Sequence, residues 1–357
     1  MKKRFNKSVA LILALSFLVL WGCAPQQKPL PEEGSSFSVH FIDVGQADAA
    51  LILCDGKAMM IDGGNSEDSN LIYSYLSKRQ ITHLDYMVAT HPHEDHIGGL
   101  AGALNAATVG TVYCPVTEYD SGVFRNFKKY VEKQGAAITV PRKGDTFELG
   151  NAVCTVIAVD PDAEDTNNTS IVLRIEYGKT SFLFTADAER AVELELVDSR
   201  YKLESTVLKV GHHGSDTSTS YVFLREIMPE YAVISVGADN DYGHPTGEVL
   251  SRLRDADVKV LRTDKHGTVV CTSDGKTVSF QTEKYSGDVL GVTGESDAET
   301  KDDGVDYVLN TKESSMKFHY PDCSAVEKMS QKNRRDYHGT RDELIKQGYT
   351  PCGICKP

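Results

Sequence analysis

The sequence lacks an excess of basic residues. Its 357 residues include 38 Lys and Arg against 51 Asp and Glu, which gives a formal net charge of −13. This balance argues against a protein that holds nucleic acid through a broad basic surface. It does not exclude an enzyme whose metal ions supply the positive charge within the site. The length suits one large domain with a small one, or two medium domains, and no internal repeat is present.

Long apolar runs are also missing, apart from a nearly unbroken one at Val9–Leu20 that follows a basic start. A membrane-spanning helix needs about 20 residues, so this shorter run indicates the core of a signal peptide. The following Leu20-Trp21-Gly22-Cys23 resembles the bacterial lipobox, although Trp21 is unusual there. The resemblance implies lipidation of Cys23 and anchoring to the outer face of the cytoplasmic membrane. A secreted protein or an uncleaved anchor are the alternatives, and each places the chain outside that membrane.

The rest of the chain alternates strand-like apolar runs with helical patterns, which predicts an α/β fold. Strands are expected at 37–54 (two), 57–64, 84–90, 109–115, 152–159, 170–178, 180–187, 205–211, 231–237, 258–263, 267–272 and 276–281. Helices are expected at 69–79, 97–107, 124–135 and 189–199. The acidic, Gly/Ser-rich segment 284–306 reads as a linker. The predicted order is therefore signal peptide 1–23, tether 24–36, main domain 37–283, linker 284–306 and small module 307–357.

The segment THPHEDHIGGL, residues 90–100, concentrates metal-ligand side chains directly after a buried-type strand. If the strand turns into a helix beginning near Ile97, four nitrogen and oxygen ligands converge, enough for two divalent ions. We expect Gly98 and Gly99 to let the backbone pass close beneath the metals. Glu94 is expected to point away. The four candidate ligands are His91, His93, Asp95 and His96.

The pattern H-x-H-x-D-H after a strand resembles the metallo-β-lactamase superfamily, which implies an αββα sandwich with a dinuclear site at one edge. The resemblance makes His91 and His93 ligands of the first metal, and Asp95 and His96 ligands of the second. It makes Asp187, at the end of SFLFTAD, the bridging ligand. It also implies one ligand from the pair His212 and His213, with His213 favoured, and a loop-steadying role for Asp62.

Six ordered blocks between residues 41 and 269 narrow the resemblance to the extracellular nuclease domain of ComEC-type competence proteins. They are FIDVGQADA, THPHEDHIGGL, NNTSIVLR, LKVGHHGSDTSTS, ISVGADNDYGHPTGEVL and LRTDKHGTV. Two departures stand out. The family's G-Q-G-D is Gly45-Gln46-Ala47-Asp48 here, and no third histidine for the first metal lies between His96 and Asp187. Asn168 lies roughly where the third histidine is expected in the order of ligands along the sequence, and it is a candidate for metal or substrate binding.

The resemblance implies hydrolysis of a phosphodiester by a hydroxide that bridges two Zn²⁺ or Mn²⁺ ions and attacks phosphorus in line. Asp95 and His244 are the predicted catalytic residues, with His244 either donating a proton to the leaving oxygen, touching the phosphate or binding the second metal. Ser215, with Thr217 and Ser218, is a candidate phosphate contact. The alternative is an ordinary helix N-cap cluster. We expect Asp43 to orient metal ligands.

The C-terminal module carries a second metal signal. The spacings His319-x₃-Cys323 and Cys352-x₂-Cys355 are typical of a structural zinc site. The pattern resembles the N-terminal zinc module of the Ada DNA-repair protein. His338 is the competing fourth ligand, and a disulfide is the alternative to zinc. Four other cysteines stand singly in strand-like runs and are expected to be buried thiols: Cys54, Cys114, Cys154 and Cys271.

Three functions are compatible with these observations. The favoured one is a cell-surface, metal-dependent phosphodiesterase acting on nucleic acid, above all DNA. The second is a metallo-hydrolase of small esters, thioesters or lactams, and the third is a non-catalytic surface DNA-binding protein. Residues 307–357 hold nine Lys and Arg against six Asp and Glu, so the module could grip nucleic acid. Alternatively, the module is a metal-stabilised cap at the end of the domain or a protein-binding tail. The sequence predicts no oligomeric state.

Overall fold

The computed structural model describes residues 36–284, 305–312, 315–321, 323–339, 341–352 and 355. The predicted signal peptide, the lipidation site Cys23, nearly all of the tether and most of the linker lie outside these residues. Among the helices that the structure describes, none is both long and apolar enough to cross a bilayer.

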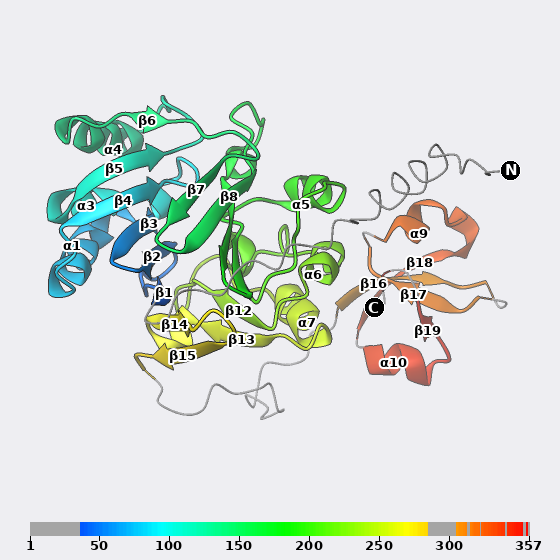
Figure 1. The fold of residues 1–357 in the computed structure, drawn as a ribbon. Coiled ribbons are helices and arrows are strands. Elements are labelled where there is room, and N and C mark those ends of the chain that lie inside the picture. The colour runs from blue at the N-terminus through cyan, green and yellow to red at the C-terminus, as the bar shows by residue number, and fades with distance from the viewer. Residues whose placement is uncertain are drawn as a thin grey trace, which may run out of the picture.

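Two mixed β-sheets form the larger part of the molecule (Figure 1). Their strands are β1 (Phe37–Phe41), β2 (Ala49–Cys54), β3 (Lys57–Gly63), β4 (His83–Val88), β5 (Thr108–Tyr113), β6 (Ile138–Thr139), β7 (Thr146–Leu149), β8 (Ala152–Ala158), β9 (Val172–Tyr177), β10 (Thr180–Phe184), β11 (Val207–Lys209), β12 (Tyr231–Ile234), β13 (Lys259–Arg262), β14 (Val269–Ser273) and β15 (Val278–Thr282). One sheet has the order β15-β14-β1-β2-β3-β4-β5-β6, and the other has the order β13-β12-β11-β10-β9-β8-β7.

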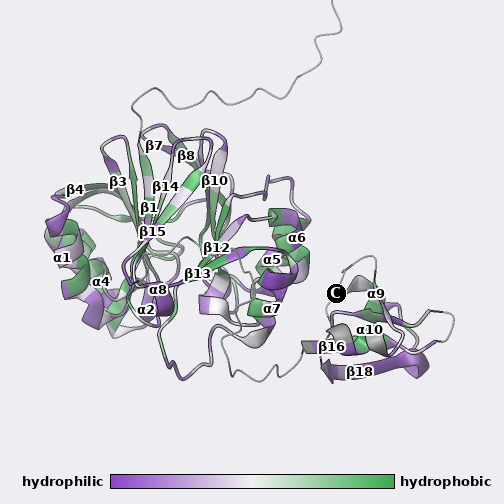
Figure 2. Cartoon of the chain, turned by 90° about the horizontal axis from the view of Figure 1, so that it is seen from below, coloured by the Kyte–Doolittle hydropathy of each residue, from purple (hydrophilic) through white to green (hydrophobic). Residues whose placement is uncertain are grey.

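Helices cover the outer faces of both sheets (Figure 1). Those packed on the first sheet are α1 (Ser69–Lys78), α3 (Leu100–Ala106) and α4 (Gly122–Lys133). Those packed on the second are α5 (Arg190–Val197), α6 (Tyr221–Ile227) and α7 (Gly247–Asp255). The short helices in this part are α2 (Glu94–Ile97), α8 (Thr263–His266), η1 (Ser66–Asp68), η2 (Thr166–Thr169) and η3 (Gly211–Gly214). The layers confirm the predicted αββα sandwich, with polar residues on the outer helix faces (Figure 2).

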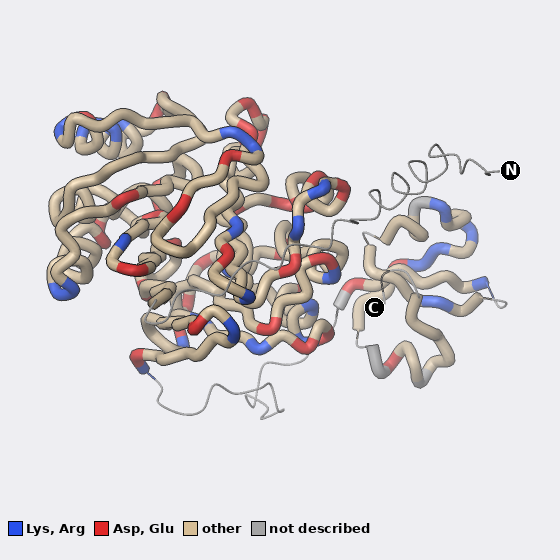
Figure 3. Tube along the Cα trace, in the orientation of Figure 1, with Lys and Arg blue, Asp and Glu red and all other residues tan. Residues whose placement is uncertain are grey.

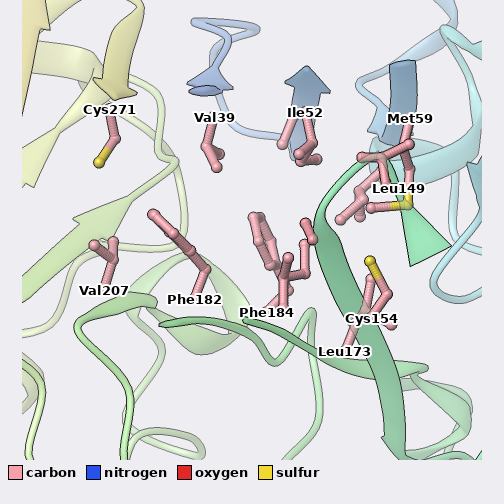
Figure 4. Packing of buried hydrophobic residues seen from close by; sticks show 14 of the residues in the cluster. Val39, Ile52, Met59, Leu149, Cys154, Leu173, Phe182, Phe184, Val207 and Cys271 are labelled. Carbon is pink, nitrogen blue, oxygen red and sulfur yellow. The ribbon is translucent and has the colours of Figure 1, made fainter. Parts of the chain in front are cut away.

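The central core lies between the two sheets. Figure 4 shows Val39, Ile52 and Met59 of the first sheet facing Phe182 and Phe184 of the second. These side chains are at most 3% exposed, so their burial supplies the main hydrophobic stabilisation of the sandwich. The four single cysteines are buried free thiols, as the sequence predicts: Cys54, Cys154 and Cys271 between the sheets, and Cys114 under the helices.

The segment after β4 differs from its prediction. The expected single helix at 97–107 is split into α2 and α3, and α2 begins at Glu94 with His93 as its N-cap. The two glycines also have another role than expected. A Cβ on Gly98 would collide with the backbone nitrogen of Ser66, and one on Gly99 with the carbonyl oxygen of Gly63. These glycines therefore permit close packing against the end of β3 rather than an approach to metals.

The C-terminal module is a separate four-stranded sheet, β18-β16-β17-β19, with its own small core. Its elements are β16 (Val305–Asn310), β17 (Lys317–His319), α9 (Ser324–Glu327), η4 (Gln331–Asn333), β18 (Arg334–Gly339), α10 (Arg341–Lys346) and β19 (Thr350–Pro351). The ring of Tyr320 stacks on Tyr221 of α6, and both hydroxyls donate to Asp255 Oδ2, at 2.9 and 3.0 Å. These contacts join the module to the helices of the second sheet.

A buried histidine in β1 predicts acid sensitivity. His40 is 8% exposed, and its Nδ1 lies 2.9 Å from the Tyr75 hydroxyl oxygen. Burial, with a smaller contribution from Arg79, lowers the pKa of His40 from 6.5 to about 4. Between these values the unfolded chain binds a proton that the folded chain does not. The stability contributed by neutral His40 is therefore present above pH 6.5 and lost as the pH falls towards 4.

We expect the free energy of unfolding to fall between pH 7 and pH 5 by about 1–2 kcal/mol less in His40→Gln than in the unsubstituted protein. Urea unfolding of both proteins at the two pH values measures the difference. Equal losses would show that His40 does not titrate differently on folding.

Candidate metal centre

The predicted ligands converge where parallel strands end. Strands β3 and β4 pair in parallel, as do β10, β11 and β12. The carboxyl ends of parallel strands meet at one edge of a sheet. Asp62 lies near the end of β3, the loop with His91 follows β4, Asp187 follows β10, and the pair His212 and His213 follows β11. The two sheets therefore contribute their ligands to a common edge of the sandwich.

Four of these side chains form a compact cluster. Asp95, His96, Asp187 and His213 each offer a ligand atom, and the four atoms lie within 4.8 Å of one another. Nε2 of His213 is 3.2 Å from Asp95 Oδ2, and Nε2 of His96 is 3.3 Å from Asp187 Oδ1. Among the described residues, neither His96 Nε2 nor Asp187 Oδ1 has a hydrogen-bond partner of good geometry, although both are buried. Orphaned buried atoms of this chemistry fit a divalent cation.

A second group of ring nitrogens lies on the other side of Asp187. His91 Nε2 and His93 Nδ1 are 3.1 Å apart. His91 Nε2 and His212 Nε2 approach the same carboxylate oxygen, Asp187 Oδ2, at 3.7 and 3.6 Å. His213 instead lies 3.7 Å from Asp187 Oδ1. Both histidines of the His212-His213 pair therefore face Asp187, one towards each group of ligands.

The charges around the cluster favour a bound cation. Burial opposes protonation of His96, but the carboxylates of Asp187, Asp62 and Asp95 outweigh it and raise the pKa of His96 well above its usual value. For His213, burial is likewise outweighed by Asp187 and Asp48, and the pKa rises to about 10. A site that holds protons this strongly is one in which carboxylates exceed the available positive charge. A divalent ion would replace those protons.

Asp62 and the backbone orient the ligand rings. Asp62 accepts hydrogen bonds from the Thr90 backbone N–H at 2.8 Å and from the Thr90 hydroxyl at 2.7 Å. Its Oδ2 also lies 2.8 Å from His96 Nδ1, so the Nε2 of that ring faces the cluster. Nδ1 of His213 lies 3.1 Å from the carbonyl oxygen of Ser235 and leaves its Nε2 facing Asp95. Such contacts select the ring tautomer that can bind metal.

A buried ion pair that the sequence did not predict lies behind the cluster. Lys209 Nζ is 2.7 Å from Asp48 Oδ2, and both side chains are at most 7% exposed. Asp48 Oδ1 lies 3.3 Å from His213 Nδ1, and the Asp48 backbone N–H donates to the carbonyl oxygen of Asp95 at 3.0 Å. A signal for both was present. Asp48 stands at the aspartate of the G-Q-G-D block, and Lys209 is a charged residue inside an apolar strand.

The other predicted site residues lie around this centre. The ring of His244 is 5.9 Å from that of His212, between ring centroids, and its Nδ1 is buried without a hydrogen-bond partner among the described residues. Asn168 Oδ1 accepts a hydrogen bond from the Glu189 backbone N–H at 3.0 Å, so it holds the chain that follows Asp187. Ser215 Oγ is 3.0 Å from Thr217 Oγ1, while the N-cap of α6 is Ser220.

Two acidic residues near the motif stand apart from the ligands. The prediction that Asp43 orients metal ligands is wrong, because its Oδ2 pairs with Lys284 Nζ at 2.7 Å on the outside of the domain. Glu94 is exposed and lies outside the described ligand clusters. The α2 turn directs Asp95 and His96 inward and leaves Glu94 in solvent.

The predicted zinc ligands of the C-terminal module also lie close together. His319, Cys323, Cys352 and Cys355 offer ligand atoms within 4.8 Å of one another. Both ring nitrogens of His319 are buried without hydrogen-bond partners among the described residues, and no disulfide joins the three cysteines. This donor set fits a closed structural zinc site. His338, the alternative ligand, lies instead 2.7 Å from Asp306, measured from Nδ1 to Oδ1, at the exposed surface.

Comparison with known proteins agrees with this geometry. The family model of the Metallo-beta-lactamase superfamily matches residues 42–238. Similar curated proteins include ComE operon protein 3 of Bacillus subtilis, 30% identical over 66% of this chain and 33% of that protein. Competence protein ComA of Neisseria gonorrhoeae is 31% identical over 67% of this chain and 32% of that protein. Recombination protein 2 of Haemophilus influenzae is 31% identical over 66% of this chain and 28% of that protein.

The chain therefore spans about a third of the length of these relatives. The six sequence blocks of the competence-protein resemblance lie in the sandwich that carries the ligand clusters. With the family model covering more than half of the sequence, the chain belongs to the metallo-β-lactamase superfamily and is related to competence proteins.

Proposed function

We propose that the protein is a metal-dependent phosphodiesterase that hydrolyses nucleic acid, with DNA as the favoured substrate, outside the cytoplasmic membrane. The observation that carries this proposal is the pair of ligand groups on the two oxygens of Asp187. Its relatives are named as competence and recombination proteins, which points to processes that act on DNA. The predicted leader and Cys23 support the location.

The candidate ligands form two sets, and each set would hold one ion. His91, His93 and His212 would hold the first with Asp187 Oδ2, so that His212 replaces the third histidine missing from the sequence. Asp95, His96 and His213 would hold the second ion together with the other carboxylate oxygen of Asp187, Oδ1. Nitrogen and carboxylate donors without thiolate suit Zn²⁺ or Mn²⁺. Such ions would supply Lewis acidity that activates water and balances the charge on phosphoryl oxygens.

The protein's own groups hold and orient the substrate around these sets. Burial, with a contribution from His212, lowers the pKa of His244. Its ring is then neutral near pH 7 and offers an N–H group to a phosphate or leaving oxygen. The hydroxyls of Ser215 and Thr217 lie beside His212, where they can contact a second phosphoryl oxygen. Lys209 neutralises Asp48 and so keeps another buried negative charge from opposing the anionic substrate.

The module supports a polymeric substrate. Its exposed basic side chains gather just after α9 and on η4 and β18, where Figure 3 shows Lys and Arg along one end of the module. They are Lys328, Lys332, Arg334 and Arg335. Cationic side chains in such an arrangement contact phosphates without reading sequence. A hydrolase of small esters, thioesters or lactams, the second candidate, uses the same metal ligands but has no need of this module.

The test compares substrates on the purified protein with Mn²⁺ or Zn²⁺. We expect metal-dependent cleavage of single-stranded or plasmid DNA and no turnover of a lactam or a thioester. The control is the double variant Asp95→Ala, His96→Ala, which lacks two ligands of one set. Turnover of the lactam or thioester without cleavage of DNA or RNA would replace the proposal with the second candidate.

A further inference from the structure

The loop between β12 and α7, residues 235–246, presents an aromatic ring beside the metal centre. Tyr242 is 72% exposed, more than any other large hydrophobic side chain that the structure describes. Its ring lies 5.7 Å from that of His244, between centroids, at an interplanar angle of 26°. His244 in turn lies beside His212. A row of three rings therefore leads from the carboxylate of Asp187 to solvent.

The loop is built to hold this ring in place. Asn240 donates from Nδ2 to the carbonyl oxygens of Gly237 and His244, at 2.9 and 2.6 Å. Its Oδ1 accepts from the backbone N–H groups of Tyr242 and His244, at 3.2 and 3.0 Å. One side chain thus ties both ends of the turn that carries Tyr242. The Gly237 N–H also donates to Gln46 Oε1 at 3.1 Å, which fixes the loop to the domain.

The charges on the loop favour contact with a base over contact with a phosphate. Asp239 and Asp241 are exposed on either side of the turn. Their carboxylates repel phosphates, whereas the aromatic ring of Tyr242 is exposed to solvent and available for stacking. Stacking of bases on exposed aromatic side chains is the usual way in which proteins hold single-stranded nucleic acid without reading its sequence.

We infer that Tyr242 is the stacking platform for an unpaired nucleobase next to the scissile phosphate, so that the centre takes single-stranded nucleic acid. This inference rests on the proposed nuclease function. In a duplex the base is stacked and paired within the helix, and its face is not available to the ring unless the pair opens. Duplex ends and internal base pairs are therefore poorer substrates than single strands.

The experiment measures kcat/KM on a short single-stranded oligonucleotide and on the same oligonucleotide with abasic residues on both sides of the cleaved bond. We expect Tyr242→Ala to lower kcat/KM on the normal strand about tenfold. It should leave kcat/KM on the abasic strand within about twofold of the unsubstituted value, because no base remains to stack. Tyr242→Phe and Tyr242→Trp should retain activity on both, since each keeps an aromatic face.

The matched control is Tyr73→Ala, which removes another exposed tyrosine, 47% exposed on α1, and should change neither rate. An unchanged rate of Tyr242→Ala on the normal strand, or an equal loss on both strands, would overturn the inference while the nuclease function stands. If the unsubstituted protein cleaves no nucleic acid, the proposed function itself fails. Metal content, measured for each variant, should be the same, because Tyr242 binds no ion.

Discussion

Asp187→Asn is expected to abolish hydrolysis and to lower the metal content of the protein. Asp187 is 2% exposed, and its two oxygens face the two groups of ligands. Burial opposes its ionisation, but His96, His213 and His91 outweigh burial and hold the pKa of Asp187 well below its usual range. It is therefore charged near neutral pH. The amide that replaces it has a similar shape but carries no charge.

The size of the effect follows from what the ions contribute. Lewis-acid stabilisation by a bound ion is worth several kcal/mol. Since each 1.36 kcal/mol is a factor of ten in rate, we expect a loss of about a thousandfold or more in kcat. Elemental analysis should show fewer bound ions in the main domain, and circular dichroism should show an unchanged fold.

The control for Asp187→Asn is Glu94→Gln, which removes the same charge at an exposed position two residues from His96. It should keep both its ions and its rate. If Asp187→Asn retains full activity with its ions bound, Asp187 does not join the two sets, and the assignment of ligands to two ions is wrong.

We propose that the cluster of His319, Cys323, Cys352 and Cys355 holds a structural zinc ion. Loss of this ion is expected to unfold the C-terminal module and leave the sandwich intact. The core of the module consists of a few side chains, which is too little to stabilise so short a unit alone. A structural zinc site contributes about 10–16 kcal/mol of apparent binding free energy near pH 7, which becomes folding free energy where the unfolded chain holds no site. Cys352→Ser removes one of the four ligands.

Limited proteolysis and hydrogen exchange should show rapid cleavage and exchange in residues 305–352 of Cys352→Ser, with protection of residues 36–284 unchanged. His319→Ala should behave in the same way. His338→Ala is the matched control, because that histidine lies at the surface outside the ligand cluster. Its exposed contact with Asp306 adds little stability. A protease-resistant module in zinc-free Cys352→Ser would show that the metal is not needed for folding.

The same variants distinguish a role of the module in nucleic-acid binding from the hydrolysis at the metal centre. If the module grips nucleic acid, Cys352→Ser should bind a long single strand more weakly while hydrolysing a small phosphodiester at the normal rate. Unchanged affinity would favour the end-cap alternative.

The local spacing of the motif was enough to predict a group of candidate ligands, but not the residues that contact them from elsewhere in the chain. His91, His93, Asp95 and His96 lie within six residues, so any strand-to-helix turn brings them together. The ion pair of Asp48 and Lys209 joins residues 161 positions apart in the sequence, with no periodic pattern between them. The packing role of Gly98 and Gly99 was equally invisible, because it depends on the backbone of β3 and η1, which is brought beside them only by the fold.

The sequence by itself determined the fold class and the donor chemistry, because both depend on patterns that repeat or cluster along the chain. Apolar runs define the strands, and His, Asp and Cys at short spacings define the sites. Only the tertiary structure decided which donors share a site. It places His212 and His213 near opposite oxygens of Asp187, leaves His338 outside the cluster of His319 and the cysteines, and brings Tyr242 close to His244 at the candidate metal centre. The physical reason is that these relations are set by where strand ends and loops meet in space, and sequence separation carries no information about that distance.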